Sequence, residues 1–169
     1  SGTCAVDIDS WNDTLKLLAE RGIDLNGLIN DPHSVMIDSG NPGHAKLLYR
    51  APFGLVLPSK KISYSAPDGT RQVAYELRCA TNNGLTVQDL LPSAINHPKT
   101  GRPYRWAGNG HFSNLPLLPH ELLALWQDLT QQDSERIIST DTMAASWDEI
   151  RSALEHIPAE CSREEWLTV

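Results

Sequence analysis

Apolar and polar residues alternate over several short stretches of the chain, which is the pattern of strands with one buried face. The first stretch spans 3–9, where Val6 and Ile8 point to one side and Asp7 and Asp9 to the other. Similar stretches predict further strands at 34–38, 44–50, 60–66, 71–79 and 85–91. Turn residues at Asn41-Pro42-Gly43 and Pro67-Asp68-Gly69 predict two tight antiparallel connections.

Helical spacing of apolar residues occurs on both sides of these strands. A helix is expected near 10–21, with Ser10 at its N-cap and Gly22 as its end. A second helix is expected from 119 to about 129. The pattern predicts the α+β class, with a mixed or antiparallel sheet, helices on one of its faces and further helices near the C-terminus.

Composition narrows the class of protein. The 169 residues are 40% hydrophobic and 21% charged, as in ordinary globular domains. We find no apolar run that could span a membrane, so no membrane partner is expected. The three cysteines are far apart and form no C-x-x-C pair, which argues against a disulfide framework and favours a cytoplasmic location, the host cytoplasm if the protein is viral.

Charge is unevenly distributed along the chain. The net charge is −7, yet residues 44–105 hold nine Lys or Arg and three Asp or Glu, a local excess of six positive charges. Such segregation favours a local phosphate-binding surface within an acidic protein. A solvated sheet face is the alternative.

The two aspartates of the first strand are candidates for metal binding. Asp7 and Asp9 share a strand face, where two carboxylates repel each other unless a cation lies between them. Oxygen ligands suit Mg²⁺ or Mn²⁺, and paired metal ions serve displacement reactions at phosphorus. The alternative is an ordinary strand end in which Asp9 or Ser10 caps the next helix.

Two other strands carry polar faces that match this one. His44, Lys46 and Arg50 alternate along one strand, and Glu76 and Arg78 along another. If these strands join the sheet of the aspartates, one face collects three carboxylates and several cations.

Taken in their order along the chain, several short motifs resemble those of the bifunctional primase–polymerase (Prim-Pol) domain of the archaeo-eukaryotic primase superfamily, as found in phage and plasmid replication proteins. The matching pieces are Asp7-Ile8-Asp9, the turn from Ser39 to His44, Leu48-Tyr49-Arg50, Tyr75-Glu76-Leu77-Arg78, Leu91-Pro92-Ser93 and Gly101-Arg102-Pro103-Tyr104-Arg105-Trp106. The resemblance covers roughly 1–127. It implies an RRM-like primase core and template-dependent nucleotidyl transfer, that is, DNA primase and DNA polymerase activity.

The resemblance also implies roles for individual residues. Asp7, Asp9 and Glu76 would be catalytic and would hold two Mg²⁺ or Mn²⁺ ions. The residues expected to bind the nucleotide are His44, Ser39, Lys46, Arg50 and Arg78. Those expected to bind nucleic acid are Lys99, Arg102, Tyr104 and Arg105. The implied partners are a DNA template and primer, nucleoside triphosphates, and a helicase domain in the same longer chain or in trans.

The resemblance has limits. Family members usually carry further residues before the first motif, so the chain is expected to be a fragment. Its domains are expected to be a partial catalytic core at 1–128, a linker at 129–146 and the start of a helical primase C-terminal domain at 147–169. No catalytic role is assigned to His97, because the spacing after Pro92 is longer than in the family.

Three other classes remain open. A metal-dependent nuclease could use Asp7 with Glu76-x-Arg78, although that motif usually ends in lysine. A non-catalytic DNA-binding fragment of a replication protein is a second alternative, and a helical adaptor formed by 119–169 is a third. Tyr104 and Trp106 could stack on a base, although packing in a core is the more common role of such a pair.

Overall fold

The computed structural model describes residues 2–80, 91–92, 96–97 and 99–140, with backbone only for 133–140. The chain separates into two compact units, 1–131 and 132–169. The expected strand at 85–91 lies almost wholly outside the described residues, and the expected C-terminal helices lie entirely outside them. The identity of the second unit therefore stays a prediction.

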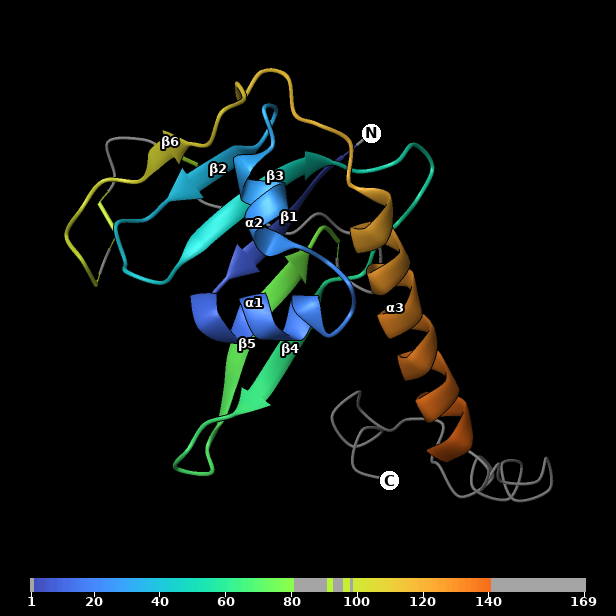
Figure 1. Cartoon of the computed structure of the whole chain (residues 1–169). Coiled ribbons are helices and arrows are strands. Elements are labelled where there is room, and N and C mark those ends of the chain that lie inside the picture. Colours follow the sequence, from blue (N-terminus) through green and yellow to red (C-terminus); the bar gives the residue numbers. More distant parts are fainter. Residues whose placement is uncertain (1, 81–90, 93–95, 98, 141–169) are drawn as a thin grey trace, which may run out of the picture. The chain divides into compact units, whose positions relative to one another are not determined.

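A sheet of six strands organises the described part of the first unit (Figure 1). Its strands are β1 (Thr3–Ile8), β2 (Val35–Asp38), β3 (Ala45–Arg50), β4 (Lys60–Ser65), β5 (Arg71–Arg78) and β6 (Arg105–Ala107). The helices are α1 (Trp11–Ala19), α2 (Leu25–Asn30) and α3 (His120–Thr140). The strand order is β4-β5-β1-β3-β2-β6, and every neighbouring pair is antiparallel. The predicted α+β class is confirmed.

The helices cover one face of the sheet, as the alternation along β1 predicts. Val6 and Ile8 are fully buried there, together with Leu18 of α1 and Trp126 of α3. The indole Nε1 of Trp126 donates a hydrogen bond to the carbonyl oxygen of Pro58 at 2.7 Å, which satisfies its buried polar atom. Burying side chains of this size stabilises the fold by about 1.5–3 kcal/mol each.

The opposite face carries a smaller apolar cluster beside its charged residues. Ala5, Val35, Ile37 and Leu48 form this cluster, and Tyr104 packs against it. One row of directly paired residues crosses the whole sheet on this face: Lys61, Glu76, Asp7, Lys46, Ile37 and Trp106. Directly opposed residues of antiparallel strands lie on the same face, so this row fixes where the functional side chains lie.

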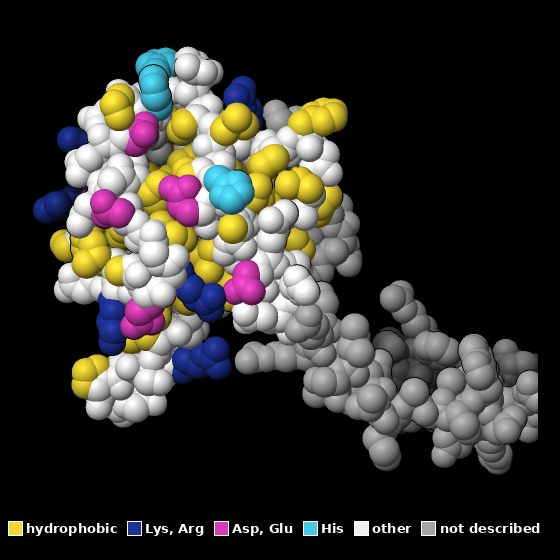
Figure 2. All heavy atoms as spheres, turned by 45° about the vertical axis from the view of Figure 1, so that its right-hand side comes forward, with side chains coloured by type: hydrophobic (Ala, Val, Ile, Leu, Met, Phe, Trp, Pro, Cys, Tyr) yellow, Lys and Arg dark blue, Asp and Glu magenta, His cyan; other side chains and the backbone are white. Residues whose placement is uncertain are grey.

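Basic residues also gather around the β4–β5 hairpin, where this row ends at Lys61. The β4–β5 hairpin projects from the sheet, and the space-filling view shows Lys and Arg side chains around it (Figure 2). Among them, Lys61 and Arg71 are exposed. Part of the positive excess of the middle of the chain is therefore a solvated hairpin surface.

Several expected elements differ from the observed ones. Helix α2 lies in a segment for which no helix was expected. The Asp24 side chain accepts a hydrogen bond from the Asn26 amide there and caps the helix. Strand β6 was not expected. Helix α3 continues to Thr140, so the linker expected at 129–146 is helical over its described part. Within the described residues, no helix is both long and apolar enough to cross a bilayer.

Candidate active site

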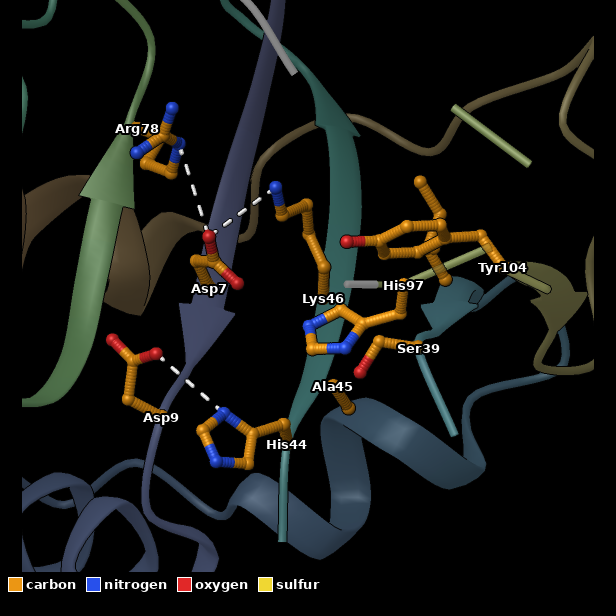
Figure 3. Close-up of a pocket in the computed structure, with 10 residues that line it drawn as sticks. Asp7, Asp9, Ser39, His44, Ala45, Lys46, Arg78, His97 and Tyr104 are labelled. Atoms are coloured by element: carbon orange, nitrogen blue, oxygen red, sulfur yellow. Dashed lines mark ion pairs between the residues drawn. The ribbon is translucent and has the colours of Figure 1, made fainter. Parts of the chain in front are cut away.

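A cavity of about 330 Å³ opens on the helix-free face of the sheet (Figure 3). Its volume lies at the lower end of the range of small-molecule sites. The residues that line it are Asp7, Asp9, Ile37, Ser39, His44, Ala45, Lys46, Arg78, His97 and Tyr104. The cavity thus brings together residues from β1, β2, β3 and β5 and from the loop before β6.

Asp7 lies at the centre of this arrangement. Its Oδ2 is 3.2 Å from Lys46 Nζ and 3.9 Å from Arg78 Nε. Burial raises the pKa of the Asp7 carboxyl, and the neighbouring Asp9 raises it further, against the lowering effect of Lys46 and Arg78. Lys46 and Arg78 therefore do not fully offset the cost of burying the Asp7 charge, and a further positive charge would stabilise the ionised carboxylate.

Asp9 and His44 form a second close pair of polar side chains in the cavity. Asp9 follows the end of β1, where its amide donates to the Ala74 carbonyl oxygen at 2.9 Å. His44 precedes β3, after Gly43 at a φ of +79°, a conformation that favours glycine. His44 Nδ1 lies 3.6 Å from Asp9 Oδ1. The backbone thus aims both side chains into the same space.

Glu76 lies beside this cavity, outside its lining. It pairs directly with Asp7 across β1 and β5, and therefore lies on the same face. Its Oε2 is 2.9 Å from Arg78 NH1. Among the described residues, no group of three or more Asp, Glu, His or Cys side chains is close enough to hold a metal ion. The proposed roles of Asp7, Asp9 and Glu76 as metal ligands stay predictions.

The other predicted binding residues are distributed over a wider area. Ser39 and Tyr104 line the cavity. Arg102 and Arg105 line a neighbouring hollow of about 360 Å³. Arg50 lies at the other end of β3, opposite Thr3. Arg50 and Lys99 are in the lining of neither space.

His97 is a cavity residue to which sequence reasoning assigned no role. Its amide donates to the Arg102 carbonyl oxygen at 2.7 Å, and its ring meets the Tyr104 ring edge to face at 5.5 Å. The Lys99 and Thr100 amides donate to His97 Nδ1 at 3.3 Å. Because Nδ1 accepts, a neutral ring carries its proton on Nε2, where it can serve as a donor. The signal that could have identified His97 in the sequence is its place in a Pro/Gly-rich loop, between the motif segments at 91–93 and 101–106.

The two sides of the cavity differ in chemistry. Asp7, Asp9 and Arg78 come from β1 and β5 on one side, and Ser39, His97 and Tyr104 from loops on the other (Figure 3). Lys46 and His44 lie between them on the β3 side. An anionic ligand that also carries a cation would find partners for both of its charges here.

In a comparison with known protein families, residues 1–121 match the family described as bifunctional DNA primase/polymerase, N-terminal. A search of curated proteins and a search of solved structures found no match. The matched range contains every residue that lines the cavity. Membership of this family implies a primase or polymerase function in replication, and suggests nucleotidyl transfer. On this match, the chain belongs to the family of N-terminal domains of bifunctional DNA primase/polymerases.

Proposed function

We propose that the cavity binds a nucleoside triphosphate and transfers its nucleotidyl group to a primer 3′-oxygen opposite a DNA template. The observation that carries the proposal is the joint placement of two carboxylates and several hydrogen-bond donors in one cavity of a primase/polymerase family member. Carboxylates alone would repel a triphosphate. Cations alone would bind it without any means of holding metal ions.

The donor set partly fits a two-metal site. Asp7 and Asp9 offer the hard oxygen ligands that Mg²⁺ and Mn²⁺ prefer. The raised pKa of Asp7 indicates a carboxylate that a further cation would stabilise. Glu76 is the adjacent carboxylate on the same face and is our third ligand, although Arg78 engages it here. Such ions, once bound, would neutralise phosphate charge and lower the pKa of the primer 3′-oxygen.

The remaining side chains act on the nucleotide or on the proposed metal ligands. His44 donates to the triphosphate, and His97 Nε2 supplies a second donor from the opposite side of the cavity. Lys46, with only 15% of its side chain exposed, orients Asp7 and offsets part of its charge. Arg78 lies close to both Asp7 and Glu76, and it likewise orients these carboxylates and offsets part of their charge. Ser39 is a further candidate for a phosphate contact.

The setting of the reaction is also part of the proposal. Lys99, Arg102 and Arg105 supply positive charge for the template and primer beside the cavity. The reaction would serve phage or plasmid replication, with a helicase domain in the same longer chain or in trans.

The test is an incubation with a primed template, Mn²⁺ and labelled nucleotides. Template-dependent extension supports the proposal. Degradation of the DNA would instead show a nuclease, and retarded migration without chemistry would show a DNA-binding module. The variant Asp9→Asn is the matched control, because it keeps the side-chain volume and removes the charge. Extension unchanged in this variant would contradict the assigned site.

A further inference from the structure

Three aromatic rings stack on one another at the edge of the sheet. The centroids of Trp106 and Phe112 are 4.7 Å apart with planes at 16°, and those of His111 and Phe112 are 4.4 Å apart with planes at 29°. Trp106 is 38% exposed and Phe112 is 48% exposed. Of the two roles considered for Trp106, core packing does not fit, because solvent reaches much of its ring.

The backbone holds this stack in place. Gly110 donates its amide hydrogen to the Ser34 carbonyl oxygen at 2.8 Å, and a Cβ at Gly110 would lie 2.3 Å from the His33 carbonyl oxygen. Asn109 Nδ2 donates to the Asn30 carbonyl oxygen at 3.2 Å. Figure 1 shows the segments after β6 and before β2 meeting at this point. The exposed rings thus lie on a segment fixed by close backbone contacts.

The stack is continuous with the cavity. Trp106 pairs directly with Ile37, which lines the cavity and pairs with Lys46, the partner of Asp7. These paired residues, from Trp106 to Asp7, all lie on the helix-free face of the sheet. Three strand spacings separate Asp7 from Trp106, about 14 Å. This distance corresponds to about four base steps along a stacked strand.

Two arginines lie in or just before β6, the strand that carries Trp106. Arg102 and Arg105 line a hollow at the end of β2 together with Asp38, Gly40 and Pro103. Proteins that bind single-stranded nucleic acid combine positive charge with exposed aromatic rings, because every base has a face that can stack.

We infer that the stack of Trp106, Phe112 and His111 is a platform on which bases of the single-stranded DNA template stack beside the cavity. This inference rests on the proposed nucleotidyl-transfer function, since it names the template as the occupant. Stacking tolerates any sequence, as a template-reading enzyme requires. Arg102 and Arg105 contact the backbone phosphates of the same strand.

The test compares a dye-labelled oligothymidine with an oligomer of abasic sites of equal length. Phe112→Ala and Phe112→Leu remove the ring, whereas Phe112→Tyr retains it. The matched control is Phe53→Ala, because Phe53 is 91% exposed on another loop. We expect loss of the ring to weaken binding of oligothymidine about 5- to 150-fold, with abasic binding unchanged. Phe112→Tyr and Phe53→Ala should match the wild type.

Several results would overturn the inference. These are wild-type protein that does not bind oligothymidine, ring-deleted variants that bind it normally, and equal loss on both oligomers. A wild-type dimer that Phe112→Ala dissociates would show that a second copy occupies the stack. Primer extension, measured in parallel, separates this inference from the proposed function. If the protein extends primers but its binding to oligothymidine does not depend on the Phe112 ring, the platform alone is refuted. If binding depends on the ring but no primer is extended, the proposed function alone is refuted.

Discussion

Replacing Asp7 with asparagine separates a metal ligand from a structural residue. The substitution keeps the side-chain size and removes a charge that lies 3.2 Å from Lys46 Nζ. Burial raises the pKa of Asp7 above its ordinary value of 3.8. A raised pKa means that this side chain contributes stability below the unfolded pKa and loses that contribution as the pH rises through the folded one. At neutral pH, therefore, Asp7→Asn should leave the melting temperature of the metal-free protein unchanged or raise it.

The effect of metal is expected to be larger. Mn²⁺ at a hundred times its Kd should stabilise the wild type by about 2.7 kcal/mol. For a unit of this size that corresponds to roughly 8–12 °C in melting temperature. Asp7→Asn should lose most of this shift, because one of the proposed oxygen ligands is replaced by a neutral amide.

The assay is thermal unfolding with and without Mn²⁺ near pH 7, repeated in acid. Glu20→Gln is the control, since Glu20 is an exposed residue outside the cavity lining and should melt as the wild type does under both conditions. The difference between Asp7→Asn and the wild type should vanish below about pH 4. A metal-free melting temperature lowered by several degrees would show that Asp7 is a structural ion-pair partner. A retained Mn²⁺ shift would show that it is not a ligand.

Three further predictions concern single residues. His44→Ala should weaken nucleoside triphosphate binding about 10- to 150-fold, from the loss of one charge-assisted hydrogen bond worth about 1.5–3 kcal/mol. Calorimetry should show Mn²⁺ binding retained, and loss of metal binding instead would make this histidine a ligand. Trp126→Phe should lower the free energy of unfolding in urea by about 1–3 kcal/mol, because the Pro58 carbonyl oxygen loses its donor; an unchanged midpoint would contradict this. Burial raises the pKa of Cys4 to about 12, so a thiol reagent at pH 8 should modify Cys4 only after unfolding, as peptide mapping would show.

Alternation along the strands was enough to predict the central sheet and its faces. Val6 and Ile8 are buried where the pattern placed them, and Asp7 lies on the other face. The period-2 pattern determines the face of each side chain, and turn residues fix the hairpins. The shared face of Asp7 and Glu76 follows from these two rules alone.

The elements that were missed are short or polar. Helix α2 has six residues, too few to show a helical period, and β6 has three. The end of α3 is polar, so no apolar face marks it in the sequence. Propensity and periodicity carry little information about such segments.

The positions of His97 and Phe112 could not be predicted from the sequence for a related reason. His97 enters the cavity through a turn closed by Arg102, and Phe112 reaches Trp106 through a glycine segment packed on residues before β2. Both placements depend on tertiary contacts that no local pattern encodes. The ion pair of Glu76 with Arg78 on the same strand was equally unforeseen, although alternation put both on one face.

The most direct measurement of the central claim is incorporation of a single labelled nucleotide opposite a defined template base, with Mn²⁺ and a primed template. The wild type and Asp7→Asn are compared at equal concentration, after melting has shown both to be folded. We predict that the wild type adds the complementary nucleotide and that Asp7→Asn reduces addition to background. Equal incorporation by the two proteins would contradict the assignment of this cavity as the nucleotidyl-transfer site.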